Sequence, residues 1–124
     1  MRVFSVKAKI WNIADKSKLV EAMFIVDTGA TYTLMPSSAL KALGVKPIRS
    51  AKLRLAYSKL VEKPIGEIAI EIDGYSASAT PVIFGEKGVH LLGVTTMEQL
   101  GLAPDPIEKK LKPAEALLMN QEAL

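Results

Sequence analysis

The residue best suited to perform chemistry is Asp27, in the segment Val26-Asp27-Thr28-Gly29-Ala30. It follows the apolar run Phe24-Ile25-Val26, so it stands where a strand is expected to leave a hydrophobic core. A carboxylate in that place is unfavourable unless hydrogen bonds or a function compensate. Carboxyl groups activate water or protonate a substrate oxygen, so the chemistry indicated is acid–base hydrolysis. The alternative is an Asx-type turn, in which Asp27 only accepts bonds from its own downstream amides.

Composition removes most competing hydrolytic chemistries. The chain of 124 residues contains no cysteine, which excludes disulfides, thiol nucleophiles and cysteine-based zinc sites. His90 is the single histidine, so one chain cannot build a metal site from several imidazoles, and we expect neither a metal nor another cofactor. No Gly-x-Ser-x-Gly segment is present to place a serine nucleophile beside it. His90 is therefore interpreted as a strand residue with no catalytic role.

The length and composition are those of one folded domain. About half of the residues are hydrophobic and 23% are charged, which is typical of globular proteins. No apolar run approaches the roughly 20 residues that cross a bilayer, and the first residues alternate instead of forming a signal-peptide core. We therefore expect no membrane association and a cytoplasmic location. The net charge of +3 is spread over separate lysines without interleaved aromatic residues, so no nucleic-acid partner is expected.

The first two-thirds of the chain is predicted to form strands, one of which positions Asp27. Residues 4–10 alternate between apolar and polar, and residues 19–26 become more apolar toward their end. The polar residues 12–18 between them are expected to form a turn. Asp27 should therefore be the first residue of a loop that directly follows the second strand.

A hairpin and another strand follow. Residues 52–72 are predicted to form two strands, with Ala56-Tyr57-Ser58-Lys59 as the tip between them. Asp73-Gly74 is a strong signal for a two-residue turn. It leads into a predicted strand at residues 75–84, in which Pro81 indicates an edge or a break.

Two short helices, each ending at a glycine, are expected at matching places. The first covers residues 36–44, with Gly44 as its stop. The second starts at Thr95, which has capping-box spacing with Glu98, and stops at Gly101. Each helix follows an apolar strand that ends in a glycine, which suggests a pseudo-symmetric unit.

Taken in order, these motifs resemble those of the retropepsin family, the retroviral and retroviral-like aspartic proteases. The matching segments are the catalytic loop at 24–30, the flap tip at 56–59, the strand and hairpin at 68–74, and the second marker Leu91-Leu92-Gly93. The resemblance covers roughly residues 2–104. It implies an all-β, closed β-barrel-like acid protease fold with one or two short helices.

The resemblance also implies a homodimer that acts as an aspartic endopeptidase on polypeptide substrates. Hydrolysis by carboxylates alone needs one group to activate water and one to protonate the substrate, and two carboxylates about 3 Å apart share a proton and supply both roles. The chain holds one Asp-Thr-Gly and is too short for two such lobes, so each subunit of a twofold dimer would supply one Asp27.

Two other functions are compatible with the same residues. One is a retropepsin-fold module that binds a peptide or protein with little or no turnover. The other is a small, monomeric β-rich ligand-binding protein in which Asp-Thr-Gly is merely a turn.

The family resemblance assigns supporting roles around Asp27. Thr28 would hydrogen-bond across the dimer axis, Gly29 would give the loop its conformational freedom, and Gly93 would pack against the loop. An ordinary turn threonine and a glycine that begins a helix are the alternatives for Thr28 and Gly93. These side chains and backbones would hold the catalytic loop and contribute no further reacting group.

Substrate contacts are implied for four residues. Ala30 would border the substrate, Tyr57 and Ser58 would touch it from the flap, and Leu91 would line a pocket. An exposed hairpin tip and ordinary core packing are the alternatives. The flap tip also lacks the glycines of the viral flaps.

The chain departs from the best-known viral members in two further respects. Thr31-Tyr32 and Val94 stand where those members have acidic residues and an arginine that form an ion pair. Loss of both partners leaves no orphaned charge. The predicted protease domain ends at residue 104. Residues 105–124 form an extension, expected to be extended and irregular to residue 113 and then to add a dimer strand or remain a loose or helical tail.

Overall fold

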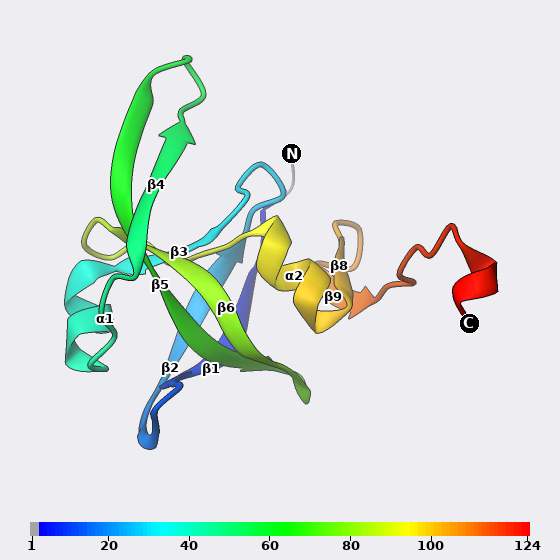
Figure 1. Cartoon of the computed structure of the whole chain (residues 1–124), viewed down its shortest axis with the longest axis horizontal. Coiled ribbons are helices and arrows are strands. Elements are labelled where there is room, and N and C mark those ends of the chain that lie inside the picture. Colours follow the sequence, from blue (N-terminus) through cyan, green and yellow to red (C-terminus); the bar gives the residue numbers. More distant parts are fainter. Residues whose placement is uncertain (1–2) are drawn as a thin grey trace.

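The computed structural model describes residues 3–124, which are arranged mainly as β-strands (Figure 1). Met1 and Arg2, with which the expected domain begins, lie outside the described residues. In chain order the elements are β1 (Ser5–Asn12), β2 (Asp15–Val26), β3 (Thr33–Pro36), α1 (Ser37–Ala42), β4 (Arg49–Arg54), β5 (Leu60–Ile72), β6 (Tyr75–Gly85), β7 (Leu91–Leu92), α2 (Val94–Leu100), β8 (Leu102–Asp105), β9 (Lys110–Pro113) and the 3-10 turn η1 (Gln121–Ala123). The prediction of a β-rich fold with two short helices is confirmed for this part of the chain.

Seven strands form one sheet, in the order β1-β2-β7-β3-β6-β5-β4. β1 pairs with β5 as well as with β2, so the sheet curls back toward its first strand. β7 lies parallel to β2, and β3 lies parallel to β6. β4 and the first half of β5 form a long hairpin that projects from the body (Figure 1).

The turn between β1 and β2 is shorter than the predicted turn at residues 12–18. β2 begins at Asp15, so only residues 13 and 14 lie outside the two strands. The Asn12 side chain accepts a hydrogen bond from the Ala14 amide at 2.8 Å, and Asp15 accepts one from the Ser17 amide at 3.1 Å. Because these side chains satisfy the local amides, a tight turn is sufficient. The polar residues that follow form an exposed strand.

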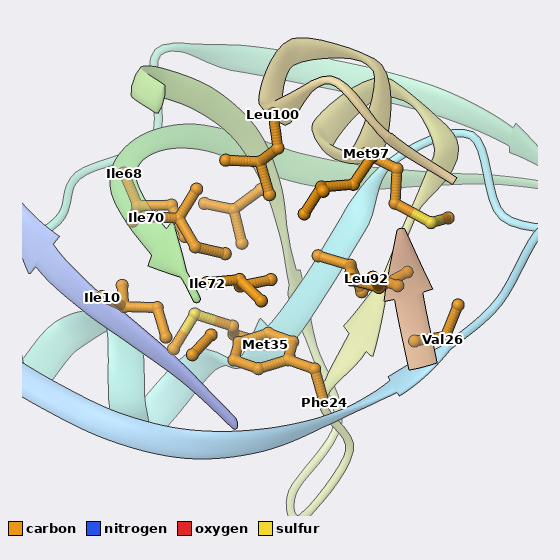
Figure 2. Packing of buried hydrophobic residues seen from close by; sticks show 14 of the residues in the cluster. Ile10, Phe24, Val26, Met35, Ile68, Ile70, Ile72, Leu92, Met97 and Leu100 are labelled. Atoms are coloured by element: carbon orange, nitrogen blue, oxygen red, sulfur yellow. The ribbon is translucent and has the colours of Figure 1, made fainter. Parts of the chain in front are cut away.

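The core collects apolar side chains from distant parts of the chain. Figure 2 shows these side chains converging from β1, β2, β5, β7 and α2, among them Ile10, Phe24, Ile70, Leu92 and Met97. All five are almost completely buried. β2 therefore passes through the core and ends just before Asp27, which lies at its margin.

Pro81 is not at the edge of the sheet, because β6 lies between β3 and β5. The first of the two predicted alternatives, an edge strand, is therefore wrong, whereas the second, a break, is found in the pairing of β6 with β3. The residues of β6 that pair with β3 begin at Val82, directly after Pro81. Proline has no amide hydrogen to donate. Because Pro81 precedes the stretch that pairs with β3, that pairing loses no hydrogen bond.

Both helices end as predicted at glycines with positive φ. Gly44 follows α1 with φ of 76°, and Gly101 follows α2 with φ of 70°. This left-handed conformation is the one that favours glycine at a helix C-terminus. Both helices therefore end with a glycine in the same left-handed conformation.

The start of α2 differs from the prediction. The helix begins at Val94, its N-cap is Gly93, and no side chain caps it, so the capping role expected of Thr95 is wrong. The amide of Thr95 instead donates to the carbonyl oxygen of Thr31 at 3.0 Å. A neighbouring loop satisfies the amides that a capping side chain would otherwise serve.

The chain beyond α2 begins with a second, two-stranded sheet. β8 and β9 pair in antiparallel register, so the prediction of an irregular segment at residues 104–113 is wrong. Leu102 and Leu111 anchor this hairpin in the main core, and Lys112 contacts Asp105 at 2.8 Å. β8 spans the predicted domain end at residue 104, and that division stays a prediction.

Residues 114–124 leave the body as an exposed segment that ends in η1 (Figure 1). Among residues 3–124 no helix has the length and apolar character required to cross a membrane.

Candidate active site

Asp27 lies in a loop directly after β2, and its backbone continues the pairing of β2 with β7. The Asp27 amide donates to the carbonyl oxygen of Leu92 at 3.0 Å. Its Oδ1 accepts a hydrogen bond from the Gly29 amide at 2.9 Å, and its carbonyl oxygen accepts one from the Ala30 amide at 3.2 Å. This is the geometry of an Asx-type turn. The turn orients the carboxylate. Because Asp27 is only half-buried, the carboxylate remains accessible to water.

The far side of this loop is attached to the start of α2. The Val94 amide donates to the carbonyl oxygen of Ala30 at 2.8 Å, and the Thr95 amide donates to that of Thr31 at 3.0 Å. Two of the free amides at the helix N-terminus are therefore used to hold the loop. The loop is tied at one end to a strand and at the other to a helix.

Gly93 is required by space rather than by backbone conformation. Its φ of −93° is accessible to any residue. A Cβ at this position would lie 2.4 Å from the Tyr32 carbonyl carbon and 2.8 Å from the Thr33 amide nitrogen. The end of the Asp27 loop thus packs directly on the Gly93 backbone.

Three buried threonine hydroxyls fix the strands behind the loop. Thr96 Oγ1 lies 2.6 Å from Thr33 Oγ1 and 2.7 Å from Thr80 Oγ1, and all three residues have no exposed surface. The Gly93 amide donates to Thr33 Oγ1 at 3.1 Å. This network joins β3, β6 and α2. This network was not predicted from the sequence, in which the sole signal was a threonine at inward-facing positions of apolar segments.

A cleft lies between the Asp27 loop and β4. Gly29, Ala30 and Leu91 line it, so the structure brings these three expected residues together. Tyr57 and Ser58 do not line it; they lie at the tip of the β4–β5 hairpin, where Tyr57 is 73% exposed. Thr28 is also exposed, beside Asp27.

The floor and the outer edge of the cleft were not predicted from the sequence. The floor comes from the side chains Tyr32, Leu34, Leu53 and Ile83, which pack in a second, smaller hydrophobic cluster. The edge carries two exposed cations, Lys52 and Arg54, and no acidic residue is among the described residues that line the cleft. The cleft is therefore apolar at its base and positive along β4.

The predicted hairpin tip at residues 56–59 is confirmed as a turn. The Leu55 amide donates to the Lys59 carbonyl at 2.8 Å, and the Ser58 amide donates to the Leu55 carbonyl at 2.9 Å. Arg54 Nη1 donates to the carbonyl oxygen of Ser58, whose φ is 67°. These bonds are all internal to the hairpin.

His90 supports the base of the loop. Its carbonyl oxygen accepts from the Ile25 amide at 3.0 Å, and its ring packs edge-to-face against Phe24 with centroids 5.1 Å apart. Burial lowers the pKa of His90, because the charged ring loses hydration there. The interpretation of His90 as a packing residue fits this geometry.

Comparisons with known proteins agree with the fold. A family model described as aspartyl protease matches residues 7–102. A comparison with curated proteins finds no match. The fold is similar to part of the foamy viral protease–reverse transcriptase, solved in complex with an RNA/DNA hybrid, with a TM-score of 0.57 and 15% identity. That alignment covers 94% of this chain and 13% of the viral chain, and at this identity it shows the fold alone.

Proposed function

Because the chain belongs to the retropepsin-like aspartyl protease family, we propose that it is an aspartic endopeptidase that works as a homodimer. Each subunit contributes one Asp27, and the two carboxylates meet at the dimer axis. The pairing of β1 with both β2 and β5 supports the closed, barrel-like form expected for such a subunit.

The position of Asp27 carries the proposal. Its loop ends a core strand, is bonded to Leu92 and to the start of α2, and borders a cleft lined by Ala30 and Leu91. Within the described residues, no group of three or more His, Cys, Asp or Glu side chains is placed to hold a metal ion. One fixed carboxylate per chain can supply only half of a proton-sharing pair. A second copy of the same loop is the simplest source of the other half.

The reaction follows from such a pair. The ionised carboxylate takes a proton from water, and the water oxygen attacks the carbonyl carbon of the peptide bond. The protonated carboxyl group gives its proton to the carbonyl oxygen, which forms a tetrahedral intermediate. Transfer of a proton to the amide nitrogen then breaks the carbon–nitrogen bond and releases an acid and an amine.

The substrate is proposed to be an extended polypeptide. An extended strand presents alternate side chains to a cleft, and the apolar floor suits apolar side chains. Ala30 and Leu91 would contact the substrate, Gly29 and Gly93 would support the loop, and Thr28 would bond across the axis. Tyr57 and Ser58 would reach the substrate when the hairpin closes over it.

A peptide-binding module without turnover is the second candidate. Thr31-Tyr32 and Val94 stand where the viral members have an ion pair. The apolar cleft would also hold a peptide that is never cut. The two functions differ in one observable, the appearance of cleaved products.

The decisive experiment incubates the protein with unfolded polypeptides from acidic to neutral pH and follows new N-termini by mass spectrometry. Asp27→Asn should abolish cleavage. Asp73→Asn is the matched control, because Asp73 also occupies a turn, at φ of 50°, where asparagine is equally suited. Cleavage that survives in Asp27→Asn would overturn the mechanism, and peptide binding without cleavage by any form would favour the module.

The dimer is tested by mixing subunits. If equal amounts of wild-type and Asp27→Asn subunits exchange at random, about one quarter of the dimers hold two aspartates. Activity per total protein should then fall to about one quarter of the wild-type value, whereas independent subunits would give about one half. A value of one half that persists after exchange would contradict the shared site.

A further inference from the structure

The last eleven residues form an exposed, largely apolar segment whose first part, residues 114–117, lines a hollow shared with Glu98, Gly101, Leu102 and Ala103 of the body. Leu117 and Met119 are each 83% exposed, and Leu118 is 56% exposed. The last backbone bond from this segment to the body is donated by the Ala114 amide to the Gly101 carbonyl, at 2.8 Å. After Ala114, the backbone hydrogen bonds in the described chain join residues 120–124 to one another. Three adjacent large apolar side chains in water are unfavourable, so a surface that covers them would stabilise the protein.

Charge separates this segment from the chain before it. Residues 114–124 contain Glu115 and Glu122 and no lysine or arginine, whereas the preceding strand β9 carries Lys110 and Lys112. The segment is thus a short apolar stretch flanked by negative charge. Its binding partner should be apolar in the middle and positive at the edge.

The cleft beside Asp27 has that character. Its floor is apolar, and Lys52 and Arg54 line its edge along β4. Neither cation forms a salt bridge within residues 3–124. Glu62 lies opposite Lys52 in the pairing of β4 with β5, and Arg54 donates to the Ser58 carbonyl oxygen. The cleft therefore offers an apolar surface with two cations at its edge to a segment that has the complementary features.

Reach and direction indicate which copy supplies the segment. Ten residues beyond Ala114 span about 33 Å when extended, which is ample to cross into a neighbouring subunit. Figure 1 shows the segment leaving the body beyond α2, on the side away from the β4–β5 hairpin. It therefore points away from the cleft of its own chain.

We propose that residues 114–124 of a second copy bind as an extended strand in the cleft beside Asp27 and compete there with substrate. The competition rests on the proposed protease function, while the binding itself does not. Leu117 and Met119 lie against the apolar floor, Leu118 faces the opposite way, and Glu115, on the same face as Leu117, lies near Lys52 and Arg54. The free cleft is thus available to substrate for only part of the time, and a substrate must displace the segment.

Binding is tested without catalysis. The host is full-length Asp27→Asn with Leu117→Ser, Leu118→Ser and Met119→Ser, so that its own segment does not compete. The probe is a fluorescent synthetic peptide of residues 113–124, followed by anisotropy. Saturable binding is expected, weakened about two- to fivefold by Lys52→Glu, as for an exposed ion pair. A peptide with Glu115→Lys and Glu122→Lys should prefer the Lys52→Glu host.

The matched control is Lys46→Glu, which reverses an exposed lysine outside the cleft. It should leave the affinity for the peptide unchanged. No saturable binding at millimolar peptide, or equal effects of Lys46→Glu and Lys52→Glu, would overturn the proposal.

Competition is tested by kinetics of the full-length wild type and of the variant with three serines at 117–119. The apparent KM for a polypeptide substrate should fall about three- to tenfold in the variant while kcat stays unchanged, because the competent fraction rises. Ile107→Ser, which alters an equally exposed apolar side chain, is the control. An unchanged KM would overturn the competition. If no form cleaves any substrate, the protease function fails, and the anisotropy result still decides whether the segment binds.

Discussion

The Asp27 loop lines the cleft, the tip of the β4–β5 hairpin adjoins it at Ala56, and the two are built in opposite ways. The loop is bonded to β7 at Asp27 and to α2 at Ala30 and Thr31, and it packs on Gly93. The tip at residues 56–59 makes hydrogen bonds only within its own hairpin and is exposed. On the proposed function, the chemical group must be held in one geometry, whereas the tip must move to admit a polypeptide.

Because of this contrast, substitutions in the two regions should affect stability and activity differently. Substitutions behind the loop should lower the free energy of unfolding, because they disturb buried atoms that have no room to adjust. Substitutions at the tip should leave that free energy almost unchanged. The following predictions are ordered by their expected effect on it, from the largest to the smallest.

Gly93→Ala should be the most destabilising of these changes. The new methyl group would meet the Tyr32 backbone at 2.4 Å, and backbone atoms cannot turn aside as a side chain can. We expect a loss of about 3 kcal/mol in the free energy of unfolding, as for severe overpacking. Urea denaturation at equilibrium measures it through the midpoint.

Gly101→Ala is the control for Gly93→Ala. It places the same methyl group at φ of 70° with no atom within 4 Å, so only backbone strain of about 1 kcal/mol is expected. If Gly101→Ala proves as damaging as Gly93→Ala, close packing is not what makes glycine necessary at position 93.

Thr96→Val should have the next largest effect. It removes the central hydroxyl of the network and leaves Thr33 and Thr80 without their shared partner in a fully buried site. A loss of about 2 kcal/mol is expected from the unmet hydrogen bonds. Thermal unfolding compares it with Thr95→Val, whose side chain is only half-buried. Equal effects of the two changes would show that the network contributes no specific stability.

Protonation of His90 should lower the free energy of unfolding at acidic pH. Burial holds the pKa of His90 below its ordinary value of 6.5, so the unfolded chain binds more protons between those two values. Stability is then fully present at neutral pH, and part of it is lost as the pH falls from 6.5 through the folded pKa. Urea midpoints at about pH 7.5 and about pH 5 should differ less in His90→Leu than in the wild type. An equal difference in both would assign the acid sensitivity to other groups.

The same contrast explains what the sequence could predict. The strand before Asp27, the hairpin tip at residues 56–59 and the glycines that end both helices follow from local alternation and turn chemistry. Each is decided by residues within a few positions of one another. These features also placed the candidate catalytic loop correctly at the end of a buried strand.

Around the candidate site, the errors concern contacts between distant segments. The start of α2 is set by carbonyl groups of residues 30 and 31, so its own capping-box spacing was misleading. The Thr33–Thr96–Thr80 network and the cleft floor at Leu34 and Ile83 exist only because β3, β6 and α2 become neighbours. A single sequence carries no direct signal for which strands will be adjacent.

Tyr57→Ala should separate the two regions most sharply. Tyr57 is 73% exposed and belongs to no hydrophobic cluster of the described chain, so its removal should change the free energy of unfolding by less than about 0.5 kcal/mol. If the tip closes on bound substrate, loss of the ring should still lower kcat/KM for a polypeptide by roughly tenfold, equivalent to one lost contact in the transition state. Tyr75→Ala, at the opposite end of β5 and β6, removes another exposed ring and should leave kcat/KM unchanged. Equal kinetics for the two variants would mean that the tip does not touch substrate. A large loss of stability in Tyr57→Ala would mean that the tip is part of the fixed structure, and the contrast with the Asp27 loop would then fail.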